Sequence, residues 1–256
     1  MDEALIDSFL NYLRATKTDS DNTIKAYAED LLQFHEYLKQ RKISEPAFSK
    51  VTHITIRGFL GELNDKQFSK RSIARKLSTL RSFYKYLVIE GVLDENVAKL
   101  VSSPKPSKRL PQFLYPNEIE ALLEAPKNDV LGIRNKAMLE LLYATGMRVG
   151  ELVSIKTNDV NLGSNYIIVF GKGSRERVVF FGQKAADSIE AYLKKSRPYL
   201  SKDINCEFLF LNKNGTGISD RSVRRIVKKY VNEVCLNEKI SPHTLRHSFA
   251  THMLNN

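Results

Sequence analysis

The sequence has 256 residues, enough for one large or two ordinary domains, and its 42% hydrophobic content can fill folded cores. Its 12 glycines and 8 prolines are too few for a disordered chain. Two cysteines, Cys206 and Cys235, exclude a disulfide framework and a cysteine-ligated metal site.

The net charge is +11, and it is unevenly distributed, with +2 in residues 1–103 and +9 in the remainder. A basic excess in one part of a chain is typical of a protein that binds polyanions, although many other soluble proteins share it. No apolar run approaches the ~20 residues needed to cross a bilayer. The acidic, amphipathic start MDEALIDSFLNYL is unlike a secretory signal. We therefore expect a cytoplasmic protein without a membrane partner.

Residues 1–103 carry four segments with helical periodicity, at 2–13, 20–42, 54–65 and 69–91. The second begins with cap-type residues, and the fourth can end at Gly91. Short connections between four such helices predict a small bundle. The predicted inward-facing residues are Leu5, Phe9, Leu10, Leu13, Ile24, Tyr27, Leu31, Phe34, Leu38, Ile73, Leu77, Leu80, Tyr84 and Leu87.

A proline-rich, basic stretch, SSPKPSKRLPQFL, follows the predicted bundle. Such a composition indicates an extended linker, which we place at residues 104–112. The sequence therefore predicts a first domain at 1–103 and a second at 113–256.

The second domain alternates helical segments with two β-rich runs. Helices are predicted at 115–126, 131–146, 185–200 and 219–236, and a last one begins at Ser241. The runs NYIIVF and RERVVFF flank GKGS and predict a hairpin, and EFLFLN indicates a short strand. The predicted fold class is mainly α, with a small antiparallel β-sheet in a mostly helical second domain.

Three short motifs place charged residues where they can meet an anion. In TGMRVGEL, Arg148 lies on a turn into a helix and Glu151 follows three residues later, on the same face. A buried carboxylate could hold the guanidinium in one pose, although the motif taken alone favours a surface ion pair. In FGKGSRERVVF, Lys172 lies between two glycines at the hairpin tip, with Arg175 and Arg177 beside it.

The third motif, SPHTLRHSFATHMLNN, places Ser241 as N-cap and Pro242 at the first helical position. His243 and Arg246 then share a face near a helix N-terminus, where phosphate is favoured. Leu245, Phe249 and Met253 are the predicted buried stripe. A zinc site at His243 and His247 would lack a third ligand.

In this order, the motifs ATGMRVGELVSI, GKGSRERVV and HTLRHSFATHMLNN closely resemble those of the tyrosine recombinase (phage integrase) family, of the bacterial Xer type. The first-domain segment TIKAYAEDLLQFHEYL resembles the helical, SAM-like core-binding domain of that family. The resemblance covers essentially the whole chain.

The resemblance implies a DNA strand transferase whose two domains clamp duplex DNA. A tyrosine attacks the scissile phosphodiester and forms a 3′-phosphotyrosine, with no metal or nucleotide cofactor. Arg148 and Arg246 would hold the non-bridging phosphate oxygens, and Glu151 would support Arg148. Lys172 would protonate the leaving 5′-oxygen, and His243 would act in acid–base transfer. The intact protein would act as a homo- or heterotetramer on two DNA sites.

The sequence departs from the family pattern after Arg246, because no tyrosine follows and the last tyrosine is Tyr230. We expect a truncated chain that is monomeric off DNA and that binds DNA without cleaving it alone. Two basic helical stripes are the predicted DNA contacts. They comprise Arg71, Arg75, Lys76, Arg81 and Lys85 in the first domain, and Arg221, Arg224, Arg225 and Lys228 in the second, with Arg175 and Arg177 at the hairpin.

Several functions stay open at this point. Chromosome-dimer resolution and phage or transposon integration would use the same motifs. A non-catalytic protein that occupies recombination sites is the main alternative, and a type IB topoisomerase-like enzyme is a second. A metal-dependent nuclease needs clustered carboxylates, which the sequence lacks.

Overall fold

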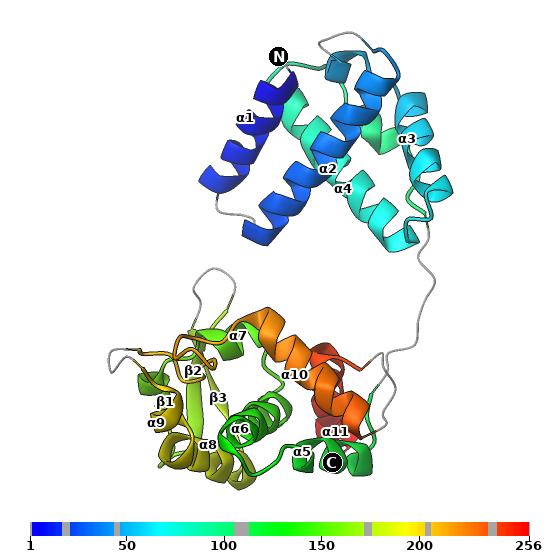
Figure 1. Cartoon of the computed structure of the whole chain (residues 1–256). Helices are drawn as coiled ribbons and strands as arrows, with labels where there is room; N and C mark the ends of the chain where they lie inside the picture. Colours follow the sequence, from blue (N-terminus) through cyan, green and yellow to red (C-terminus); the bar gives the residue numbers. More distant parts are fainter. Residues whose placement is uncertain are drawn as a thin grey trace. The chain divides into compact units, whose positions relative to one another are not determined.

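The computed structural model describes residues 2–16, 21–43, 47–104, 113–171, 176–202, 206–234 and 240–255 (Figure 1). The chain divides into two compact units, Met1–Arg109 and Leu110–Asn256. The division falls within the stretch 104–112 that the proline-rich composition indicated as a linker.

In the described residues, the first unit is a bundle of four α-helices, as predicted. Its elements are α1 (Asp2–Ala15), α2 (Asp21–Gln40), α3 (His53–Asp65) and α4 (Lys70–Ile89), with short 3-10 turns at Ala47–Lys50 and Val97–Leu100. Ser69 caps α4 by accepting a hydrogen bond from the Ser72 N–H. Of the predicted inward-facing residues, only Leu5 and Tyr27 are partly rather than fully buried.

Aromatic rings fill the centre of this bundle. The rings of Phe48 and Phe83 meet edge to face at 4.9 Å, and Phe34 contacts Phe59 at 5.0 Å. The buried hydroxyl of Tyr84 donates to the Phe48 carbonyl at 3.1 Å. This hydrogen bond links α4 to the turn that precedes α3. Buried residues of α2, α3 and α4 form one core.

The second unit is mostly helical with a small sheet. Its helices are α5 (Pro116–Glu124), α6 (Val130–Thr145), α7 (Val149–Ser154), α8 (Gln183–Lys195), α9 (Arg197–Leu200), α10 (Asp220–Glu233) and α11 (Pro242–Asn255). The strands β1 (Val160–Asn161), β2 (Tyr166–Phe170) and β3 (Glu176–Phe180) form an antiparallel sheet in the order β1-β2-β3. The predicted hairpin is confirmed, with Tyr166 opposite Phe180 and Phe170 opposite Glu176.

Two predicted elements differ from the structure. The helix expected at 185–200 is split at Ser196, which leaves helical geometry and bonds the Val130 carbonyl through its side chain at 2.6 Å. The run 207–212 forms only isolated bridges, Lys156 with Phe208 and Leu211 with Gly217, and no strand. Leu209, Phe210 and Leu211 are buried and Phe208 is exposed, which shows that apolar runs alone do not distinguish strands from largely buried loops.

Helix α6 is the central support of the second unit, because nearly all its sides are buried. It packs against α8 and α11, and it ends at Gly146 with a left-handed φ of 57°. In α11, Thr244, Leu245 and Ser248 are buried. The predicted buried position of Met253 is wrong, since 66% of this residue is exposed. Among the described helices, none is long and apolar enough to span a membrane.

Candidate active site

Arg148 stands at the N-cap of α7, directly after the α6 terminus. Its backbone N–H donates to Oε2 of Glu151 at 2.8 Å, and its Nη1 donates to Oε1 at 3.0 Å. The Glu151 side chain is 5% exposed, whereas that of Arg148 is 60% exposed. The carboxylate therefore holds one edge of the guanidinium and leaves the rest of it open to solvent.

A second arginine holds the same carboxylate from β3. Nη1 and Nη2 of Arg177 donate to Oε1 and Oε2 of Glu151 at 2.9 and 2.8 Å, the bidentate geometry of a strong ion pair. Burial alone would raise the pKa of Glu151, but the bonds from Arg177 and Arg148 outweigh it and lower the pKa to about 2. The guanidinium fork of Arg177 is thus engaged by Glu151, and its contact with DNA stays a prediction.

The N-terminus of α11 supplies the other half of the site. The Ser241 N–H donates to the Thr244 hydroxyl at 3.1 Å, which caps the first turn. His243 is exposed and Arg246 is half-buried. Nη1 of Arg246 is buried and has no hydrogen-bond partner among the described residues. Such a buried donor costs free energy until an acceptor arrives.

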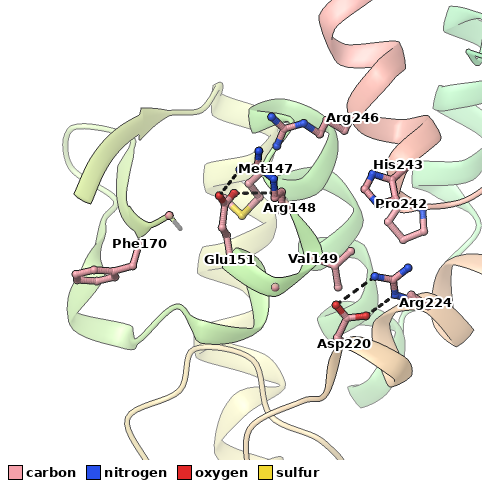
Figure 2. Close-up of a pocket in the computed structure, with 12 residues that line it drawn as sticks. Met147, Arg148, Val149, Glu151, Phe170, Asp220, Arg224, Pro242, His243 and Arg246 are labelled. Carbon is pink, nitrogen blue, oxygen red and sulfur yellow. Dashed lines mark hydrogen bonds and ion pairs between the residues drawn. The ribbon is translucent and has the colours of Figure 1, made fainter. Parts of the chain in front are cut away.

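These residues meet in one pocket of about 440 Å³ (Figure 2). Arg148 approaches it from the α6–α7 turn, Glu151 from α7, and His243 and Arg246 from α11 (Figure 2). The full lining is Met147, Arg148, Val149, Gly150, Glu151, Phe170, Gly171, Asp220, Arg224, Pro242, His243 and Arg246. Two guanidiniums and an imidazole around one concavity can bind a tetrahedral oxyanion and exchange a proton with it.

Helix α10 borders the same pocket. Asp220 accepts two hydrogen bonds from the Arg224 guanidinium, one of them from Nη2 at 3.3 Å. Arg221, Arg225 and Lys228 are exposed on the outer side of α10. Lys172 and Arg175 lie outside the described residues.

The basic stripe of α4 divides into exposed and engaged residues. Arg71, Arg75 and Lys85 are exposed. Lys76, which we expected to contact DNA, is buried, and its Nζ donates to Oδ1 of the buried Asp30 at 2.7 Å. Arg81, also an expected contact, donates from Nη2 to the Val101 carbonyl at 2.6 Å. The prediction for Lys76 is corrected, because its ammonium is buried with an internal partner, and the DNA contact of Arg81 stays a prediction.

Sequence reasoning missed two carboxylates that hold arginines, Asp30 and Asp220. The i, i+4 spacing of Asp220 and Arg224 within one helix could have identified the second. No local signal identifies Asp30, because its partners lie on another helix. Within the described ranges, no group of three or more His, Cys, Asp or Glu residues could hold a metal ion.

Comparisons with known proteins identify the family of both units. The phage integrase family model matches residues 112–256, and the phage integrase N-terminal SAM-like domain matches residues 6–91. A tyrosine recombinase XerC of Pelotomaculum thermopropionicum is 44% identical, over 98% of this chain and 84% of that protein. A tyrosine recombinase XerD of Staphylococcus epidermidis is 41% identical, over 98% of this chain and 85% of that protein.

A solved structure shares the fold. The site-specific recombinase XerH bound to its difH substrate aligns with a TM-score of 0.75 at 21% identity, over 98% of this chain and 85% of that one. Since family models match both units and relatives exceed 40% identity over nearly all of the sequence, the chain belongs to the phage integrase family of tyrosine recombinases.

Proposed function

We propose that residues 1–256 form the DNA-binding and phosphate-activating part of a site-specific DNA recombinase, which cuts and rejoins DNA through a 3′-phosphotyrosine. One observation carries the proposal most. Arg148 and Arg246 reach the same pocket from separate elements, and Arg246 has a buried, unpartnered Nη1. A non-bridging phosphate oxygen is an acceptor that would satisfy this donor.

Each residue has a distinct proposed role in activating the phosphodiester. Arg148 and Arg246 bind the two non-bridging oxygens, where negative charge grows in the transition state. Glu151 positions Arg148, because it bonds both its backbone and its side chain. His243, in the first turn of α11, transfers protons during attack and religation. Lys172 protonates the leaving 5′-oxygen, a role proposed from the family motif alone.

Duplex DNA containing a recombination site is the proposed partner. The proposed backbone contacts are exposed members of the two predicted basic stripes, namely Arg71, Arg75, Lys85, Arg221, Arg224, Arg225 and Lys228. A homo- or heterotetramer would assemble on two DNA sites, and the chain would be monomeric off DNA. The proposed biological role is chromosome-dimer resolution in the cytoplasm, or integration and excision, which would use the same motifs.

A second candidate function is occupancy of recombination sites without cleavage. No tyrosine is among the described residues that line the pocket. Tyr230, the last tyrosine, is buried, and its hydroxyl accepts a hydrogen bond from Asn135 at 2.9 Å. It is therefore unavailable as a nucleophile at this site.

A chimera tests the two candidates. Residues 1–256 would be joined to the tyrosine-bearing C-terminal segment of a XerC relative and mixed with a labelled recombination-site duplex. The recombinase proposal predicts a covalent protein–DNA adduct that is lost in Arg148→Ala and Arg246→Ala, and no adduct with residues 1–256 alone. DNA binding without any adduct from the chimera would favour site occupancy.

A further inference from the structure

A buried carboxylate in the first unit joins α2 to the basic side of α4. Asp30 lies on α2, and its side chain is 1% exposed. Oδ1 accepts from Lys76 Nζ at 2.7 Å, and Oδ2 accepts from the Thr79 hydroxyl at 2.9 Å. The Arg75 guanidinium also donates from Nη1 to Oδ2.

The buried charge and both oxygens of Asp30 are satisfied without Arg75. Lys76, with a side chain that is 7% exposed, neutralises the Asp30 charge, and together with Thr79 it gives each oxygen a donor. The Arg75 bond therefore adds little to the satisfaction of the buried group. It does restrict Arg75, a long side chain that would otherwise sample many rotamers on the surface.

The restricted guanidinium is still accessible from outside. The Arg75 side chain is 46% exposed, and within the described residues only its Nη1 is bonded, to Asp30. A planar guanidinium can bond a carboxylate along one edge and offer its other N–H groups to a second acceptor. Asp30 thus determines which N–H groups of Arg75 face outward.

The surroundings of Arg75 suit a phosphate backbone. Positions 71, 75, 78, 82 and 85 follow the i, i+4, i+7 spacing of one helix face and hold Arg71, Arg75, Ser78, Ser82 and Lys85. None is acidic. Arg71 and Lys85 are exposed, and in the described part of the unit no hydrogen bond or ion pair engages them. Cations separated by small hydroxyl side chains let a DNA strand approach closely.

We propose that Asp30 is a positioning residue for DNA binding, which orients Arg75 so that its free N–H groups meet a backbone phosphate on this face of α4. The inference deepens the proposed function, because it rests on Arg75 being a DNA contact. It has an unusual consequence: loss of a negative charge should weaken the binding of a polyanion. Simple electrostatics predicts the opposite.

The test measures the affinity of the full chain for one fluorescein-labelled DNA duplex over a range of salt concentrations. Each lost phosphate contact should reduce the steepness of the log–log plot by about 0.9. Arg75→Gln should show this loss. The double variant Asp30→Asn/Lys76→Met should show the same loss although Arg75 is retained, because it removes the positioning group at unchanged net charge. Arg57→Gln, an exposed arginine on α3, controls for the loss of one charge outside the proposed face.

A further variant covers the case in which the double variant fails to fold. Arg75→Lys leaves Asp30 with Lys76 and Thr79, and it keeps the charge, but an ammonium cannot bridge Asp30 and a phosphate as a planar fork does. We expect a loss close to that of Arg75→Gln. The positioning role alone is overturned if Arg75→Gln reduces the slope of the log–log salt plot while Arg75→Lys or the folded double variant keeps the wild-type slope. An unchanged plot for Arg75→Gln overturns the DNA contact and the positioning role together.

Discussion

Arg177 on β3 donates two parallel hydrogen bonds to Glu151 on α7, at 2.9 and 2.8 Å, and the same carboxylate holds Arg148. The buried Glu151 side chain thus connects β3 to the turn that carries Arg148, a proposed phosphate ligand. The position of Arg148 depends on a strand that is distant in the sequence, and not only on its local helix cap.

The first prediction concerns the pH dependence of stability. Glu151 has a pKa of about 2 in the folded chain against a usual value of 4.5, so it stabilises the fold above pH 4.5. This contribution is lost as the pH falls from 4.5 towards 2. Glu151→Gln should lower the free energy of unfolding by about 2 kcal/mol at neutral pH. Unfolding followed by circular dichroism should show the difference from wild type shrinking below pH 4.5.

The control is Glu207→Gln, which breaks an exposed ion pair with Lys156. Its effect should stay within about 1 kcal/mol because water already screens the pair. If Glu151→Gln lowered the free energy of unfolding by the same amount at pH 3 and pH 7, the lowered pKa of Glu151 would not be the source of the stabilisation.

The second prediction separates support from DNA contact at Arg177. Arg177→Gln should lower the melting temperature, because a buried carboxylate loses two charged donors. The log–log salt dependence of DNA binding should change by much less than the ~0.9 expected for a phosphate contact. Arg177→Lys should also be destabilised, since an ammonium cannot reproduce the fork. Lys156→Gln serves as the exposed control. If Arg177→Gln reduced the log–log salt dependence of DNA binding by about 0.9 without a change in melting temperature, Arg177 would be a DNA contact.

The sequence predicted local features well and long-range pairs poorly. The inward positions of α4 follow from the helical period, since Ile73, Leu77, Leu80, Tyr84 and Leu87 are all buried. The β2–β3 hairpin follows from alternation around a glycine turn. Met253 satisfied the same period and is nevertheless exposed, because a period does not reveal where the neighbouring element ends.

In the candidate site, too, pairs that are close in sequence were predictable and pairs that are distant in sequence were not. Arg148 and Glu151, three residues apart, could be paired from their spacing. The Arg177–Glu151 and Lys76–Asp30 pairs span 26 and 46 residues, and only tertiary packing brings them together. Charged residues predicted as DNA contacts therefore included some that support the fold.

The third prediction exploits the unpartnered donor of Arg246. In the absence of an anion, a buried N–H without an acceptor costs about 1–3 kcal/mol, so Arg246→Met should leave the free chain as stable as wild type or more stable. The same variant should lose the stabilisation that inorganic phosphate gives the wild type in thermal melts. Arg197→Met is the matched control, because its guanidinium donates to the carbonyls of Cys206, Phe208 and Leu209 and its loss should destabilise. Marked destabilisation of Arg246→Met would indicate a structural role instead.

The fourth prediction concerns the outer side of α10. Arg221→Gln and Arg225→Gln should each reduce the steepness of the salt dependence of duplex binding by about 0.9, without change in melting, since both side chains are exposed. Lys195→Gln, exposed at the end of α8, should change neither. Equal effects of all three variants would mean that net charge, rather than a located contact, drives binding.

The last prediction links the backbone at Gly146 to the geometry of the site. Gly146 has a φ of 57°, which costs other residues about 1–2 kcal/mol, and a Cβ there would lie 2.5 Å from the Phe249 ring. Gly146 precedes Arg148 by two residues, and Phe249 follows Arg246 by three. Gly146→Ala should therefore push α11 away from the α6–α7 turn, lowering both the stability of the second unit and its affinity for phosphate. Phe249→Leu in the same chain should restore part of both losses by relieving the contact, but not the share that comes from the backbone.

Gly61→Ala, in α3 with no atom within 4 Å of the new Cβ, is the control and should be neutral or slightly stabilising. Normal phosphate affinity in a destabilised Gly146→Ala chain would show that the two arginines do not depend on this contact for their spacing.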